Sequence, residues 1–200
     1  MTNFQKRFLS SLLLVPIALF FIIKGTYFFI FFILICFLVS SYEWFLMSKN
    51  KKYNLPGFAF IIFSFFTAYS LRTEGDQELE IFLLILITCI STDIGGYIFG
   101  KIFKGPKLTK ISPNKTYAGM FGSFFLSIIS ASIYFNNLSL FSKSYDDVEI
   151  GLQIMIKVLF ISLASQIGDL TISFFKRKSK IKNTGKIIPG HGGLLDRIDG

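Results

Sequence analysis

The last part of the chain carries the residue types that phosphate chemistry requires. Asp196 and Asp199 offer hard carboxylate oxygens, which Mg²⁺ accepts alongside the phosphates of a substrate. Gly192 and Gly193 let backbone N–H groups approach phosphate oxygens without a side chain in the way. The basic residues that would neutralise a polyphosphate are Lys176, Arg177, Lys182 and Arg197. Acids within a basic segment favour metal-bridged phosphate chemistry over the alternative, which is attraction to anionic lipid headgroups.

A second candidate set lies in the 107–116 segment, around a Ser-Pro-Asn sequence. Lys115 is a candidate clamp for a phosphate, and Ser112 and Thr116 are candidate hydroxyl donors to a substrate. Taken alone, this segment is equally typical of an ordinary turn, because serine, proline and asparagine are common turn residues.

Ionisable residues also interrupt the apolar stretches, where a charge is costly and normally faces a cavity or a partner. Glu43 and Lys157 are two of them, and for both a structural ion pair or a snorkelling side chain is the alternative interpretation. Asp93 is a third, and it would need a metal or another cation beside it. Gly96 and Gly100, which follow it, are explained by close helix packing alone.

The fourth residue that interrupts an apolar stretch is Asp169. It belongs to a polar series at three- and four-residue spacing, which places its members on one face of a helix. The series predicts the lining of a water-filled pocket, and the alternative is a polar seam between helices. Its members are Ser162, Ser165, Asp169, Ser173 and Lys176.

Helices in a membrane must position these residues. Of the 200 residues, 52% are hydrophobic and only 16% are charged, whereas soluble domains have about 25% charged residues. A helix needs ~20 apolar residues to cross a bilayer, and backbone groups in lipid must be paired within their own segment. The sequence therefore predicts an all-α, polytopic transmembrane helix bundle that forms one domain over 1–200. Its six spans are expected at 8–23, 26–47, 57–71, 81–100, 117–135 and 150–175, the third being short and so tilted, re-entrant or partly interfacial.

Charge between the predicted spans differs between the two sides of the membrane. One side holds the basic amino terminus, the 48–56 and 101–115 loops and the tail from residue 176. The other side holds three basic residues and seven acids, at positions 74, 76, 78, 80, 146, 147 and 149. Because Lys and Arg are enriched in cytoplasmic loops, the amino terminus and the candidate site are predicted to be cytoplasmic. We expect a multi-pass protein of the cell's inner (plasma) membrane.

These motifs resemble the phosphatidate cytidylyltransferase (CDP-diacylglycerol synthase) family, from about residue 40 to the end of the chain. Shorter elements that agree with the family pattern are Glu43-Trp44, Ile111-Ser112-Pro113-Asn114-Lys115-Thr116 and Gly168-Asp169-Leu170. The long carboxyl-terminal signature is matched by Ser173, Lys176-Arg177, Lys182, His191-Gly192-Gly193 and Asp196-Arg197-Ile198-Asp199. The chain departs from the pattern at Ile172 and Asn183. The final span usually found after the signature is missing, so we expect a carboxyl-terminal truncation relative to the family.

The resemblance implies an enzyme that converts CTP and phosphatidate into CDP-diacylglycerol and pyrophosphate in phospholipid biosynthesis. It implies that Asp169 and Asp196 hold Mg²⁺ or another divalent cation, with Asp199 and Asp93 as secondary ligands. His191 would orient a phosphate or donate a proton. The implied phosphate-binding residues are Lys115, Lys176, Arg177, Lys182 and Arg197, and the remaining substrate-binding residues are Ser112, Thr116, Ser173, Gly192 and Gly193.

The expected partners are CTP, phosphatidate and membrane lipid, with no nucleic acid. Gly96 and Gly100 would also permit a helix contact in a homodimer.

Three other functions remain open at this point. A CTP-dependent polyprenol or phytol kinase would transfer the γ-phosphate to an alcohol and release CDP. A transporter or channel would use the charges within the spans as an ion path, but it leaves the glycine-rich basic tail unexplained. A non-catalytic membrane protein would only bind lipid or a partner.

Overall fold

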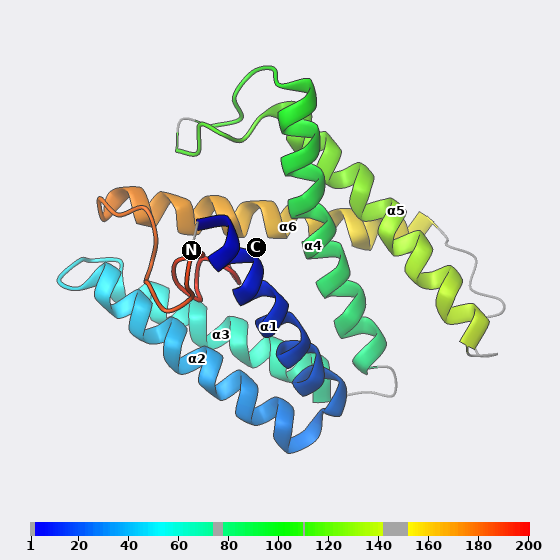
Figure 1. Ribbon diagram of the computed structural model, residues 1–200, viewed down its shortest axis with the longest axis horizontal. Coiled ribbons are helices and arrows are strands. Elements are labelled where there is room, and N and C mark those ends of the chain that lie inside the picture. Colours follow the sequence, from blue (N-terminus) through cyan, green and yellow to red (C-terminus); the bar gives the residue numbers. More distant parts are fainter. Residues whose placement is uncertain (1–2, 74–77, 110, 142–151) are drawn as a thin grey trace. The chain divides into compact units, whose positions relative to one another are not determined.

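The computed structural model describes residues 3–73, 78–109, 111–141 and 152–200, without the side chains of residues 3, 4, 6, 78 and 137–141. Several residues that the charge pattern includes therefore lie outside the described part of the chain, either entirely or with their side chains. They are Lys6, Lys110, Lys143 and the acids at positions 74, 76, 78, 146, 147 and 149. Within the described ranges the chain forms six helices and no strand (Figure 1). They are α1 Asn3–Lys24, α2 Thr26–Ser48, α3 Asn54–Thr73, α4 Glu78–Phe103, α5 Tyr117–Phe141 and α6 Leu152–Lys178. The all-α prediction is confirmed.

Each of the six described helices contains a stretch that is long and apolar enough to cross a membrane. The expectation of a short third span is wrong, because α3 is a helix of 20 residues. Pro56 lies in its first turn, where a helix needs no N–H from that residue, so the helix begins before the proline and not after it.

The described chain divides into two compact units. The first unit comprises residues 1–82 and 175–199, and the second comprises residues 83–174 with Gly200. Both α4 and α6 run from one unit into the other. The prediction of one domain over the whole chain stays a prediction.

In the first unit, α2 packs against both α1 and α3 (Figure 1). Gly25 links α1 to α2 with a φ of 64°, a conformation that favours glycine. Trp44 of α2 is buried, and its indole N–H donates to the carbonyl of Asn54 at the start of α3. A side chain at Gly57 would enter the Trp44 ring, so the glycine lets the two helices approach closely.

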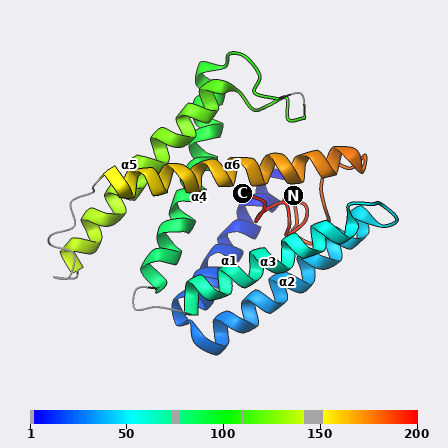
Figure 2. The same ribbon diagram turned by 180° about the vertical axis from the view of Figure 1, so that it is seen from behind.

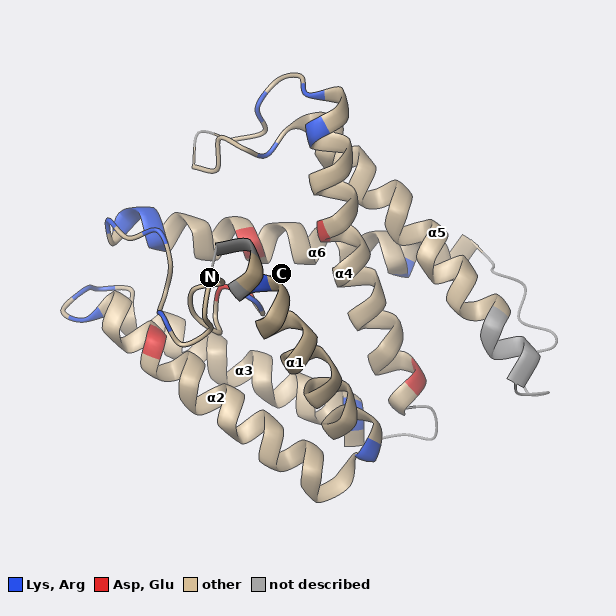
Figure 3. Ribbon diagram, viewed as in Figure 1, with Lys and Arg blue, Asp and Glu red and all other residues tan. Residues whose placement is uncertain are grey.

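Three basic stretches meet in the first unit. The Lys51 ammonium donates to the carbonyl of Lys178, and the Tyr53 hydroxyl is bonded to that of Ser179, so the 49–53 loop lies beside the end of α6 (Figures 2 and 3). Arg7 of α1 donates to the carbonyl of Gly190 in the tail. The amino terminus, this loop and the tail are therefore neighbours within this unit, and their predicted cytoplasmic side stays a prediction.

In the second unit, glycines lie at the contact between α4 and α5. A side chain at Gly96 would meet the hydroxyl of Ser123, and one at Gly119 would meet the carbonyl of Gly96. The close helix packing predicted for Gly96 is thus confirmed, with α5 of the same chain as the partner. The homodimer contact predicted through Gly96 and Gly100 stays a prediction.

Candidate active site

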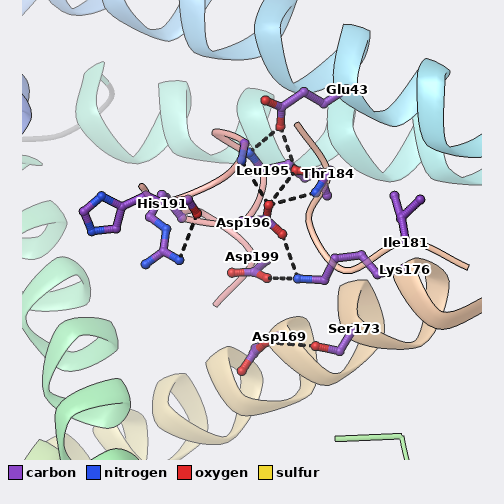
Figure 4. Close-up of polar contacts among 12 residues, drawn as sticks. Glu43, Asp169, Ser173, Lys176, Ile181, Thr184, His191, Leu195, Asp196 and Asp199 are labelled. Carbon is purple, nitrogen blue, oxygen red and sulfur yellow. Dashed lines mark hydrogen bonds and ion pairs between the residues drawn. The ribbon is translucent and has the colours of Figure 1, made fainter. Parts of the chain in front are cut away.

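Asp196 lies in the tail that follows α6, and its two carboxylate oxygens have different partners. Oδ2 accepts hydrogen bonds from the amide of Gly193 at 3.0 Å and from the amide and hydroxyl of Thr184 at 2.8 and 3.1 Å (Figure 4). Oδ1 accepts from the Lys176 ammonium at 2.8 Å. The tail therefore folds around this carboxylate, which fixes both its position and its orientation.

Lys176 is the last α6 residue of the polar series, and it connects both signature aspartates. Its ammonium lies 2.8 Å from Asp196 Oδ1 and 3.5 Å from Asp199 Oδ2. Only 11% of the Lys176 side chain and 6% of the Asp196 side chain are exposed. Burial acts to raise the pKa of Asp196, but the Lys176 hydrogen bond and the Gly193 and Thr184 amides outweigh it, and the pKa lies below its usual value.

Glu43 of α2 extends into the same tail. Its Oε1 accepts from the amide of Leu194, and its Oε2 accepts from the amide of Leu195 and the hydroxyl of Thr184, each at 2.9 Å (Figure 4). Only 1% of Glu43 is exposed, which rules out a snorkelling side chain. Its partners among the described residues are two amides and a hydroxyl, so the described contacts of Glu43 include no ion pair. The interruption of an apolar helix by an acid is explained by docking of the tail.

The two tail glycines serve this local geometry. Gly192 has a φ of 97°, which disfavours any residue with a Cβ. A side chain at Gly193 would run into the Thr184 hydroxyl and the Glu43 carboxylate. The amide of Gly192 donates to the carbonyl of Ile188, and the amide of Gly193 donates to Asp196. Both amides thus bond within the chain, and their predicted approach to a substrate phosphate stays a prediction.

His191 contacts the amino-terminal helix. Its Nδ1 lies 2.8 Å from the hydroxyl of Ser10, and its Nε2 lies 3.4 Å from the hydroxyl of Ser11. Slight burial and the guanidinium groups of Arg197 and Arg7 lower the pKa of His191, so the neutral ring is favoured. The structure gives His191 a part in holding the tail against α1, while its predicted part in the reaction stays a prediction.

The remaining basic residues of the signature are exposed. Arg177 directs one guanidinium nitrogen to the carbonyl of Ile181, and Arg197 directs one to the carbonyl of His191, both at 3.5 Å. Lys182 is exposed as well. These exposed side chains are accessible to a polyanion, as their predicted role in phosphate binding requires.

Asp169 belongs to the second unit, where it pairs with Lys115. The Lys115 ammonium contacts Asp169 Oδ2, and the Ser173 hydroxyl donates to Asp169 Oδ1 at 3.3 Å. The exposed fractions of the Lys115 and Asp169 side chains are 26% and 30%. The candidate phosphate clamp and the candidate metal ligand are thus neighbours, and a lysine beside a carboxylate can exchange that contact for a phosphate.

The segment before Lys115 forms a turn that positions it. The Lys115 amide donates to the carbonyl of Ser112 at 3.0 Å, and Pro113 occupies the second turn position, which its fixed φ favours. The Thr116 hydroxyl accepts from the amide of Gly119 at 3.1 Å and so caps α5. The turn and the helix cap thus give structural roles to residues that were predicted to bind substrate. The predicted binding of substrate by these residues stays a prediction.

The polar series of α6 divides between two environments. Ser162 is fully buried and accepts from the hydroxyl of Thr92, while Ser123 donates to the carbonyl of Thr92 at 2.7 Å. The polar-seam interpretation therefore holds at Ser162, and the water-filled pocket predicted for the rest of the series stays a prediction. Asp93 lies one position after Thr92 on an exposed face of α4.

The donor chemistry of both units fits a hard divalent cation. Carboxylate oxygens are the ligands that Mg²⁺ prefers, and Asp196 Oδ1 accepts a single bond among the described contacts while Oδ2 accepts three. Within neither unit do the described residues gather three His, Cys, Asp or Glu side chains. An ion here would be held by one or two carboxylates and by substrate phosphates. The predicted partnership of Asp169 with Asp196 joins residues of different units and stays a prediction.

Comparison with known proteins identifies the family. The profile of the cytidylyltransferase family matches residues 55–200. The chain belongs to the cytidylyltransferase family. The matched segment includes the Lys176–Asp196 pair of the first unit and the Lys115–Asp169 pair of the second.

Individual members of the family are similar over most of this chain. A phosphatidate cytidylyltransferase of Staphylococcus aureus is 38% identical over 174 residues, and one of Staphylococcus epidermidis is 35% identical over 171 residues. A third, from Staphylococcus saprophyticus, is 34% identical over 171 residues. Each match covers 82% of this chain and 61% of the relative, so the chain spans about three fifths of the length of these relatives.

Two residues of this candidate site could not be picked out from the sequence. Thr184 bonds both buried carboxylates, yet a single threonine in a tail gives no signal that distinguishes it. Ser10 bonds His191 from 181 positions away. Glu43 did carry a signal, since an acid in an apolar helix demands a partner, but the pattern did not show that the partner is the tail.

Proposed function

We propose that this protein is a CTP:phosphatidate cytidylyltransferase, a nucleotidyltransferase of phospholipid biosynthesis that forms CDP-diacylglycerol. The observation that carries the proposal is the Asp196 network, in which a buried aspartate of the family signature is bonded by Lys176, Thr184 and Gly193. The similar staphylococcal proteins are phosphatidate cytidylyltransferases, which supports the substrate assignment.

In the proposed reaction, a phosphate oxygen of phosphatidate attacks the α-phosphorus of CTP. A new P–O bond forms between the lipid phosphate and the cytidylyl group, and the bond to the β-phosphate oxygen breaks. Pyrophosphate leaves with the electron pair of that bond. Because both reactants are anions, neutralising their charge is the main catalytic task.

The chain's own cations serve that task. Lys115, which pairs with Asp169 at a partly exposed position, would exchange that contact for a substrate phosphate. The exposed Arg177, Lys182 and Arg197 would bind the remaining phosphates and the departing pyrophosphate. Lys176, which is buried between Asp196 and Asp199, would keep these two carboxylates together.

Asp169 and Asp196 would hold Mg²⁺ or another divalent cation, with Asp199 and Asp93 as secondary ligands. The bound ion supplies charge neutralisation at the reacting phosphates. This assignment rests on the family signature and on the donor chemistry of the carboxylates. His191 would orient a phosphate group through the segment that it ties to α1.

The site would face the cytoplasm, where CTP is found, in a multi-pass protein of the inner (plasma) membrane. The gathering of the amino terminus, the 49–53 loop and the tail in one unit supports this orientation, since cytoplasmic segments are rich in Lys and Arg. The acyl chains of phosphatidate would remain in the bilayer while its headgroup reacts.

The test is an assay of the purified, detergent-solubilised protein with CTP, phosphatidate and Mg²⁺. CDP-diacylglycerol and pyrophosphate should form in equal amounts. Release of CDP together with a phosphorylated lipid alcohol, when polyprenol or phytol replaces phosphatidate, would instead identify a kinase.

A further inference from the structure

We infer that Glu43 of α2 is a positioning residue for Asp196, acting through the Thr184 hydroxyl and through the amides of Leu194 and Leu195. The inference rests on the proposed function, since Asp196 is the reacting-site carboxylate whose geometry it concerns. Glu43 lies outside the 55–200 segment that matches the family profile, and nothing in that match assigns it a role.

The carboxylates of Glu43 and Asp196 both accept hydrogen bonds from the same short stretch of the tail. Three consecutive amides divide between them, with Gly193 donating to Asp196 and with Leu194 and Leu195 donating to the two oxygens of Glu43. Charge-assisted bonds from backbone amides are short and directional, so the carboxylate of Glu43 fixes the path of the backbone immediately before Asp196.

Thr184 couples the two carboxylates directly. Its hydroxyl lies 2.9 Å from Glu43 Oε2 and 3.1 Å from Asp196 Oδ2. A hydroxyl carries one hydrogen, so the two carboxylates share it. Any movement of Glu43 therefore changes the hydrogen bond that Asp196 receives.

The attachment of Glu43 is rigid. It sits on α2, next to the buried Trp44, whose indole N–H is bonded to the start of α3. A Cβ at Gly193 would strike both the Thr184 hydroxyl and the Glu43 carboxylate, and a Cβ at Gly185 would lie 2.6 Å from Glu43 Oε1. The tail thus approaches the carboxylate closely at two glycines, where a side chain would collide with it.

The pattern makes Glu43→Gln a disruptive change. The three described partners of Glu43 all donate hydrogen, and glutamine offers one acceptor oxygen and one NH₂ group. The NH₂ group would face a donor, which leaves an N–H of the tail unpaired. Thr184→Val removes the shared hydrogen at nearly constant shape, while Thr184→Ser keeps it.

The experiment measures kcat, KM and hydrogen exchange on E43Q, T184V and T184S in detergent. Exchange is followed by mass spectrometry in peptides that cover 184–199. E80Q and T67V repeat the same substitutions at sites in the same unit, and the Thr67 hydroxyl donates locally, to the carbonyl of Ser64.

We expect E43Q and T184V to accelerate exchange in these peptides, with unchanged exchange in α1, α2 and α3. Their kcat should fall about 10- to 100-fold while KM for CTP stays within about threefold, because a displacement of ~1 Å at a reacting group costs about this much. T184S and both control variants should resemble the wild type.

Wild-type exchange in E43Q and T184V would overturn the inference, as would faster exchange with an unchanged kcat. If E43Q does not fold, the T184V and T184S pair decides the question alone. A wild-type protein that makes no CDP-diacylglycerol would refute the proposed function, and the exchange comparison would still show whether Glu43 and Thr184 fix the tail.

Discussion

Asp196 of the first unit and Asp169 of the second are the two proposed metal ligands, but the chain holds them differently. Asp196 accepts four hydrogen bonds from three residues, and 6% of its side chain is exposed. Asp169 contacts Lys115 and Ser173, and 30% of its side chain is exposed. The first arrangement fixes a carboxylate, whereas the second leaves it able to change partners when a phosphate or a cation arrives.

This difference separates two tasks within one proposed site. A fixed carboxylate keeps the geometry that a transition state needs and has little to reorganise during the reaction. An exchangeable lysine–carboxylate pair can accept a substrate. We therefore expect substitutions on the two sides to have different secondary effects even where their main effect is the same.

The largest effect is expected from D196N and D169N, each of which should abolish turnover, with a kcat at least about 1,000-fold lower. The comparison lies in the second readout. D196N should also accelerate hydrogen exchange in 184–199, because an amide NH₂ would replace one of the acceptor oxygens that organise the tail. D169N should leave that exchange unchanged. Normal turnover in both variants would discard the proposed roles of these aspartates.

A smaller effect, on stability, is expected from removal of the two lysines. K176M leaves Asp196 and Asp199 buried without their cation, which typically costs about 3–5 kcal/mol. K115M removes a partly exposed pair, for which ~0–1 kcal/mol is typical. The measurement is thermal unfolding in detergent for both variants, with K182M as an exposed lysine control. Equal destabilisation by K176M and K115M would contradict the distinction between a fixed and an exchangeable carboxylate.

The smallest effect is a dependence of stability on pH. The folded-state pKa of Asp196 is depressed, so this carboxylate contributes stability above the unfolded value of about 3.9. That contribution should be lost as the pH falls through the folded-state pKa. The difference in melting temperature between wild type and D196N should therefore be constant from about pH 7 to 5 and shrink below about pH 4. A difference that does not change with acidification would contradict the stated environment of Asp196.

The sequence was sufficient for the helices and for the choice of candidate residues, because both leave local signals. Apolar stretches predict spans from composition, and a series such as Asp169, Ser173 and Lys176 predicts one helix, which α6 is. The third span was predicted too short, at 57–71, whereas α3 begins at Asn54 because proline is tolerated in a first turn.

The partners of the candidate residues could not be predicted, since they are set by tertiary contacts over long separations. Glu43 and Leu194 are 151 positions apart, and Arg7 and Gly190 are 183 positions apart. The tail glycines were predicted to bind phosphate. A sequence does not show whether a glycine is needed for a positive φ or for the close approach of another group. In the structure, Gly193 approaches a carboxylate of the chain itself.

The most direct test of the account follows the label from CTP into lipid. The protein is incubated with phosphatidate, Mg²⁺ and CTP that carries ³²P at either the α- or the γ-phosphate. We expect the α-label in the organic phase as CDP-diacylglycerol and the γ-label in the aqueous phase as pyrophosphate. D196N should form neither product. Transfer of γ-label into lipid, or α-label that stays in the aqueous phase, would contradict it.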